Sequence, residues 1–143
     1  MPAETSRAIC SLIFGGVLEK YPNLKIAFAH GGGVFPFTAG RIDHGFNVRP
    51  DLCAADNEVL PSSYLKQFYV DSLVHDENAI KFIIQTMGVE RIAMGSDYPF
   101  PLGEHHPGKL IESMELSDVT KQRLLAGTAL EWLGLNENEF SRS

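Results

Sequence analysis

His30 is the first candidate for chemistry in this sequence. It directly follows the apolar segment LKIAFA and precedes Gly31, Gly32 and Gly33. Glycines permit positive φ and let the backbone approach a ligand closely, and the N–H groups of this turn, which open a helix at Val34, can receive an anion. A tight strand-to-helix turn with a structural histidine explains the same residues, so both interpretations stand.

Asp97 is the second candidate. It lies in GSDYPFP, a loop with two prolines that follows the apolar segment RIAMG. A carboxylate in such a loop is a metal ligand, a general base or the cap of a turn. Asp71 and His75 lie at or just after the end of a further apolar segment, QFYVDSL, and His75 is either a site residue or the cap of a loop.

Arg41 and His44 lie three residues apart, so they share one face of an expected helix. A solvated helix face explains them, and the alternative is recognition of a substrate carboxylate, for which a guanidinium fork is well suited. His105 and His106 lie in a polar loop, GEHHPG, and are expected to be exposed. The large aromatic side chains are predicted to be core rather than a stacking platform: Phe35, Phe37, Phe46, Phe100 and Trp132.

The elements that position these residues alternate between helices and short strands. Apolar residues recur every three or four positions over 4–21 and 77–87, which predicts amphipathic helices. Further helices are predicted at 34–46 and within 107–140. Three apolar segments of strand length are predicted to be strands: 24–29, which we expect to be buried on both faces, 67–73 and 91–95.

Cap residues mark the expected helix ends. Thr5 or Ser6 is predicted to begin the first helix, and Asp76 is the expected N-cap of the helix at 77–87. The remaining signals are N-caps at Ser117-Asp118 and Thr128 and stops at Gly127 and Gly134. Alternating strands and helices imply parallel strands with helical crossovers, so His30, His75 and Asp97 are expected at the same end of one sheet.

Length, composition and charge argue for a folded domain and against binding to nucleic acid or membranes. The 143 residues are 44% hydrophobic and 21% charged, which suits one folded domain. A net charge of −6 with no run of Lys or Arg argues against nucleic acid as a partner. No apolar segment approaches the roughly 20 residues that span a bilayer, and no signal peptide is recognised, so we expect no membrane association and a cytoplasmic protein. Cys10 and Cys53 are expected to be reduced thiols.

Three segments together resemble metal-dependent decarboxylases of the amidohydrolase superfamily: AHGGGVFPFTAGRIDHGF (29–46), FYVDSLVHD (68–76) and GSDYPFPLGE (95–104). The likeness covers essentially the whole chain. It implies an α/β fold, a distorted (β/α)8 TIM barrel, with a divalent metal, usually zinc, at the carboxyl ends of the strands. It further implies a homodimer whose small-molecule carboxylate substrate is a conjugated semialdehyde acid of tryptophan (kynurenine) catabolism, and whose activity limits quinolinate formation.

The resemblance also implies roles for four residues. Asp97 matches a metal-binding aspartate, and His30 matches a histidine that lies beside the metal and acts on its bound water. Arg41 matches an arginine that reaches into the neighbouring subunit's site and holds a substrate carboxylate. Phe100 matches an aromatic residue near the substrate. The other histidines and both cysteines match no role.

The family's other metal ligands, an H-x-H pair and a further histidine, have no counterpart in this sequence. A catalytic zinc needs about three protein ligands, and the barrel takes about 250 residues. We therefore expect residues 1–143 to form a single, incomplete domain, the carboxyl-terminal part of the barrel with about three strands, which is inactive alone. The alternatives are a related aromatic-acid decarboxylase or hydrolase, and a non-catalytic fragment that associates with the full-length subunit.

Overall fold

Three short parallel strands form the centre of the molecule in the computed structural model, which describes residues 1–136 and 138. The strands are β1 (Ala27–Phe28), β2 (Tyr69–Asp71) and β3 (Ile92–Ala93), and β2 lies in the middle. Ala27 pairs with Tyr69 and Val70 pairs with Ile92, both in parallel register. The predicted α/β fold with parallel strands is confirmed, with each strand shorter than the segment that predicts it.

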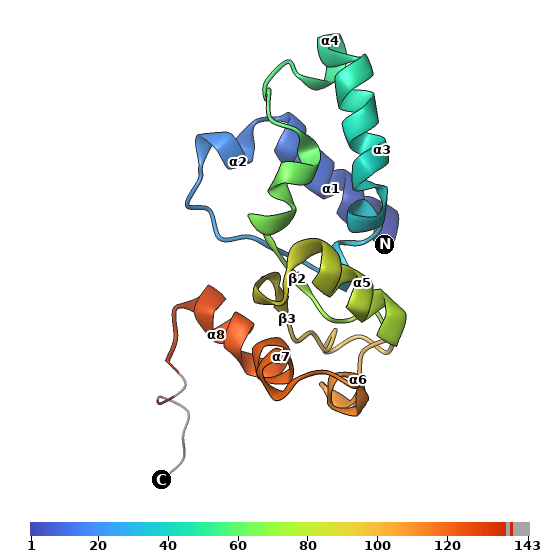
Figure 1. The fold of residues 1–143 in the computed structure, drawn as a ribbon, viewed down its shortest axis with the longest axis vertical. Helices are drawn as coiled ribbons and strands as arrows, with labels where there is room; N and C mark the ends of the chain where they lie inside the picture. Colours follow the sequence, from blue (N-terminus) through green and yellow to red (C-terminus); the bar gives the residue numbers. More distant parts are fainter. Residues whose placement is uncertain (137, 139–143) are drawn as a thin grey trace.

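Helices connect the strands and extend the molecule on either side of the sheet (Figure 1). Before β1 lie α1 (Pro2–Phe14) and α2 (Val17–Lys20), and the 3₁₀ turn η1 (His30–Gly32) follows β1. Between β1 and β2 lie α3 (Phe35–Val48), α4 (Pro50–Cys53) and the 3₁₀ segment η2 (Pro61–Lys66). Between β2 and β3 lie α5 (Glu77–Met87) and the 3₁₀ turn η3 (Val89–Arg91). After β3 come α6 (Lys109–Ser113), α7 (Asp118–Gln122), the π-helical turn η4 (Arg123–Gly127) and α8 (Thr128–Leu133).

The first helix differs from its prediction at both ends. It stops at Phe14, and Gly16 takes a left-handed conformation with φ 66° before α2 begins. The prediction that Thr5 or Ser6 caps this helix is wrong, because the helix already begins at Pro2 with Met1 at the N-cap. The Ser6 hydroxyl instead donates to the Pro2 carbonyl at 2.9 Å.

Two of the remaining caps are confirmed. Asp76 accepts a hydrogen bond from the N–H of Ala79 at 2.8 Å, and Ser117 accepts one from the N–H of Thr120 at 3.2 Å. Gly134 ends α8 with φ 71°, as predicted.

The helix stop at Gly127 and the cap at Thr128 are wrong. Gly127 keeps helical angles (φ −58°, ψ −41°), so the chain continues from η4 into α8 without a break. The Thr128 hydroxyl donates across to the Val89 carbonyl at 3.0 Å, so this side chain ties α8 to η3.

The core gathers around the middle strand. Phe35, Phe68 and Val70 are fully buried, and Phe35 and Phe68 meet edge to face with ring centroids 6.0 Å apart. Along β1, in contrast, Ala27 is exposed and Phe28 only half-buried. The prediction of a first strand buried on both faces is wrong for this chain, because the described elements leave the Ala27 side of β1 uncovered.

The predicted core aromatics divide into two groups. Phe35 and Phe46 are buried, and Trp132 is half-buried against Tyr69. Phe37 and Phe100 are 80% and 65% exposed, so for them the prediction of a core position is wrong. Phe37 lies on the outer face of α3, and Phe100 lies in the proline-containing loop after β3.

Neither cysteine is paired. Cys10 and Cys53 are both free and half-buried, in agreement with the expectation of reduced thiols, and burial raises the pKa of the Cys10 thiol. Among the residues that the structure describes, no helix has the length and apolar character needed to cross a bilayer.

Candidate active site

The structure brings His30 and Asp97 together. The first follows β1 and the second follows β3, so they approach across the end of the middle strand. His30 Nε2 lies 3.6 Å from Asp97 Oδ1, and the two side chains are 22% and 17% exposed. Both ring nitrogens of His30 are buried without a hydrogen-bond partner in the described part of the chain. The sequence prediction that these groups meet at one end of the sheet is confirmed.

The backbone at each strand end has the same unusual conformation. His30, His75 and Asp97 have φ values of 58°, 53° and 56°, and each follows a different strand. Non-glycine residues with such angles cost about 1–3 kcal/mol each and cluster at ligand sites. The fold therefore holds two imidazoles and one carboxylate in strained positions at the carboxyl end of the sheet.

The backbone N–H groups of the glycine turn after His30 all donate to acceptors within the protein. The N–H of Gly31 donates to Asp71 Oδ1 at 3.0 Å, the next two glycines donate to carbonyl oxygens inside the turn, and the N–H of Val34 donates to Ser6 Oγ at 2.8 Å. The prediction that these N–H groups receive an external anion is wrong, because each already has a partner. The anion at this turn is the carboxylate of Asp71.

A cavity of about 400 Å³ lies against His30 and Asp97. Its walls are mainly apolar and come from the start of α1, the glycine turn and the loops after β2 and β3. Its side chains with acid–base or metal-binding capacity are His30, His75 and Asp97. A largely apolar pocket with a few convergent polar groups is typical of a small-molecule site.

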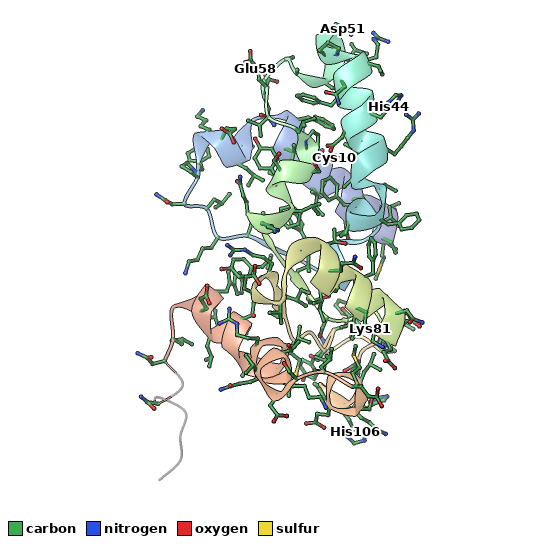
Figure 2. The ribbon with its side chains drawn as sticks, in the orientation of Figure 1. Cys10, His44, Asp51, Glu58, Lys81 and His106 are labelled. Carbon is green, nitrogen blue, oxygen red and sulfur yellow. The ribbon has the colours of Figure 1, made fainter. Side chains whose placement is uncertain are left out.

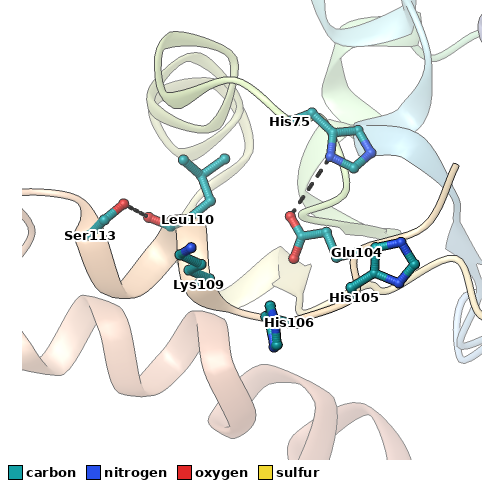
Figure 3. Close-up of a pocket in the computed structure, with 7 residues that line it drawn as sticks. All are labelled: His75, Glu104, His105, His106, Lys109, Leu110 and Ser113. Carbon is teal, nitrogen blue, oxygen red and sulfur yellow. Dashed lines mark hydrogen bonds and ion pairs between the residues drawn. The ribbon is translucent and has the colours of Figure 1, made fainter.

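His75 also lines a second cavity of about 390 Å³, shown in Figure 3. There its Nδ1 lies 3.9 Å from Glu104 Oε1. Glu104 is 16% exposed, and its other oxygen accepts a hydrogen bond from the N–H of Gly108 at 3.2 Å. His105 and His106 lie on the rim and are exposed, as predicted. Sequence reasoning missed Glu104, which carries no motif of its own.

Arg41, His44 and Phe100 lie apart from both cavities. All three are exposed, and none lines the cavity beside His30 or the one beside Glu104. In Figure 2, His44 lies on α3 toward one end of the long axis and His106 toward the other. Neither Arg41 nor Phe100 therefore contacts the cavity beside His30 in this structure, and their predicted substrate roles stay predictions.

The donor set at His30 and Asp97 fits part of a metal site. A carboxylate and an imidazole whose nitrogens make no hydrogen bond within the described residues are donors that a divalent cation accepts. A full site needs about three protein ligands, and no cluster of three or more His, Cys, Asp or Glu side chains suited to a metal is found in the described residues. This chain thus supplies a portion of such a site.

The sequence profile of the amidohydrolase family matches residues 1–135. The chain belongs to the amidohydrolase family. Among curated members, it is 62% identical over 141 residues to a 2-amino-3-carboxymuconate-6-semialdehyde decarboxylase of Dictyostelium discoideum, and 46% identical over 139 residues to the protein of that name in Caenorhabditis elegans. These alignments cover 98% and 96% of the chain but 39% and 35% of the relatives, so the chain spans well under half of their length.

Solved structures of decarboxylases share the fold of this chain. The chain matches 5-carboxyvanillate decarboxylase from Sphingomonas paucimobilis with a TM-score of 0.84 at 22% identity, over 94% of the chain and 41% of that structure. It matches the enzyme of the same activity from Novosphingobium aromaticivorans, solved with manganese and 4-hydroxy-3-methoxy-5-nitrobenzoic acid, with a TM-score of 0.81 at 28% identity, over 94% and 40%. The three parallel strands with their helices are thus a part of the amidohydrolase barrel.

Proposed function

We propose that the complete protein to which this chain belongs is a metal-dependent decarboxylase of 2-amino-3-carboxymuconate 6-semialdehyde in tryptophan catabolism. The names of two relatives at 62% and 46% identity support this substrate. The observation that carries the chemistry is the approach of His30 Nε2 to Asp97 Oδ1 at 3.6 Å, with neither imidazole nitrogen hydrogen-bonded among the described residues. Residues 1–143 form one incomplete domain in this proposal.

The proposed cofactor is zinc, with Asp97 as its ligand from this chain and His30 beside it. Such a metal would supply Lewis-acid chemistry, because it would lower the pKa of a water molecule bound to it toward neutrality. Manganese occupies the structure from Novosphingobium aromaticivorans, so metal analysis of the purified full-length protein decides between the two ions.

His30 is the general base of the proposed mechanism. An imidazole side chain is suited to taking up and releasing a proton near neutral pH. It takes a proton from water, and the resulting hydroxide adds to a carbon of the conjugated diene. The imidazolium returns the proton to the neighbouring carbon, which bears the departing carboxylate. Carbon dioxide then leaves, and the electron pair of the broken carbon–carbon bond restores the double bond and expels hydroxide.

Arg41 and Phe100 are proposed to bind the substrate. A guanidinium group binds a carboxylate through two parallel hydrogen bonds, and Arg41 is exposed on α3, away from its own cavity. We therefore place it in the site of the second subunit of a homodimer, where it holds a substrate carboxylate. Phe100, 65% exposed in the loop after β3, supplies an aromatic contact to the conjugated substrate.

Carbon dioxide release by the full-length, metal-loaded protein tests the proposed activity. The substrates compared are 2-amino-3-carboxymuconate 6-semialdehyde, 5-carboxyvanillate and 2,6-dihydroxybenzoate, each at the same concentration. We expect turnover of the first to dominate. The second candidate function, an aromatic-acid decarboxylase, is favoured by the match to the structure with bound nitrobenzoic acid at 28% identity, and dominant turnover of an aromatic acid would establish it instead.

Mixed dimers test the assignment of Arg41. Arg41→Ala and His30→Ala proteins are each expected to be inactive. After unfolding and refolding together, about half of the dimers contain one subunit of each kind, and each such dimer has one complete site. We expect about a quarter of the parental activity to return. No recovery, with mixed dimers shown by differently tagged subunits, would place Arg41 in its own subunit's site, and an active Arg41→Ala homodimer would place it outside the site.

A further inference from the structure

We infer that Asp71 is a positioning residue for the reaction, which holds His30 in place through the backbone of Gly31. The inference rests on the proposed role of His30. Asp71 does not belong to the lining of the cavity beside His30. It is the last residue of β2 and pairs with Ala93 of β3. Because β2 is the middle strand and pairs on both sides, the backbone that carries the Asp71 carboxylate is fixed by both neighbouring strands.

The imidazole of His30 is not held by a protein hydrogen bond, since neither ring nitrogen has a hydrogen-bond partner among the described residues and Nε2 only approaches Asp97 Oδ1 at 3.6 Å. Its position is therefore set by its backbone, which has a strained φ of 58°. Asp71 Oδ1 accepts the N–H of the next residue, Gly31, at 3.0 Å, and also the N–H of Leu73 at 3.1 Å. One carboxylate oxygen thus joins the turn after β1 to the loop after β2.

The loop after β3 contacts the same carboxylate. Gly95, two residues before Asp97, packs so closely that a Cβ there would lie 2.7 Å from Asp71 Cβ and 3.0 Å from Oδ2. The neighbouring Ser72 hydroxyl accepts the N–H of Gly95 at 3.3 Å. Asp71 therefore contacts segments from all three strand ends, two of which carry the reacting pair.

Three substitutions at this position, in the full-length protein, test the inference. Asp71→Ala removes the acceptor, and displacement of a catalytic group by about 1 Å lowers the rate about 100-fold. We expect kcat to fall by about that factor, with KM and bound metal unchanged. Asp71→Asn keeps an oxygen at the Oδ1 position and is expected to restore kcat to within about tenfold of the parent. Asp71→Glu moves the acceptor by one methylene and is expected to behave like Asp71→Ala.

Ser117→Ala is the matched control, because it also removes a side-chain acceptor for a backbone N–H, at the start of α7 and outside both cavities. We expect its kcat to stay at the parental value. The inference is overturned if Asp71→Ala retains kcat within about threefold of the parent, if Asp71→Asn is as slow as Asp71→Ala, or if bound metal falls in proportion to kcat. Should Asp71→Ala fail to fold, the contrast between Asn and Glu carries the same test.

Hydrogen exchange at the Gly31 amide gives a readout that does not need activity. We expect this amide to be protected in the parent and to exchange at least about tenfold faster in Asp71→Glu. Equal exchange in the two proteins would overturn the inference even if kcat changes. A parental protein without decarboxylase activity would instead refute the proposed function, while the exchange data still report on the Asp71–Gly31 contact.

Discussion

Gly31→Ala is the substitution whose effect the structure defines most sharply. Gly31 has φ 61°, a left-handed conformation that costs an L-residue about 1–2 kcal/mol. A Cβ at this position would lie 2.7 Å from Val74 Cγ1, well inside contact distance, and relief of such overpacking costs about 1–3 kcal/mol. Alanine also restricts the unfolded chain, which offsets about 0.4–1 kcal/mol. We expect a net loss of about 1–5 kcal/mol in the free energy of unfolding.

Gly40→Ala is the control, since it makes the same chemical change on helix α3. Nothing lies within 4 Å of a Cβ at Gly40, and replacement of glycine by alanine inside a helix stabilises by about 0.5–1 kcal/mol. Urea denaturation of the full-length proteins, compared at equal slope, measures both effects. The two substitutions are expected to shift the midpoint in opposite directions. If both shift it the same way, the account of the glycine turn is refuted.

Three further outcomes are expected. Asp76→Ala removes the N-cap of α5 and is expected to lower the free energy of unfolding by about 1 kcal/mol, measured in the same urea assay. An unchanged free energy of unfolding would show that this hydrogen bond does not stabilise the fold. Burial and the nearby Glu19 carboxylate raise the pKa of Tyr64 to about 12 from a usual value of 10.0. Because Tyr64 ionises at lower pH in the unfolded state than in the folded state, its contribution to the free energy of unfolding is complete below pH 10 and is lost as the pH rises toward 12. Tyr64→Phe should therefore reduce the fall of the urea unfolding midpoint over that pH interval. An unaltered fall would exclude Tyr64 as its source. The isolated 143-residue chain is expected to release no carbon dioxide and to keep no stoichiometric zinc after dialysis, because two donors are too few for a catalytic site; retained zinc together with turnover would contradict this.

The sequence indicates the strand-to-helix alternation because its local signals are strong. The apolar period over 77–87 and the cap at Asp76 predict α5 with the bounds that the structure has. The convergence of His30 and Asp97 follows from one geometric rule, that parallel strands end on the same side of a sheet. Both predictions depend on short-range pattern and simple topology.

Burial on β1 was not predictable in this way. The apolar segment LKIAFA reads as a strand covered on both faces, but coverage depends on which elements lie beside it. In the described residues no element covers the Ala27 side of β1, so Ala27 is exposed. Phe37 and Phe100 fail for the same reason, since their apolar character says nothing about which face of α3 or of a loop finds a neighbour.

The glycine turn shows a different limit. Its positive φ values were foreseen from the run of glycines, but the partners of its N–H groups were not. Asp71 and Ser6 reach the turn from 40 and 28 residues away in the sequence. Such long-range side-chain contacts leave no periodic pattern, and the only signal was an aspartate at the end of a strand otherwise rich in apolar residues.

Metal content and turnover of His30→Ala and Asp97→Ala, in the full-length protein, test the central claim that these two side chains serve one metal centre. We expect His30→Ala to lose turnover and keep nearly all of its metal, and Asp97→Ala to lose both. Asp51→Ala, which removes an exposed carboxylate paired with Arg49, should change neither. Turnover that survives in His30→Ala, or full metal content in Asp97→Ala, would contradict the account.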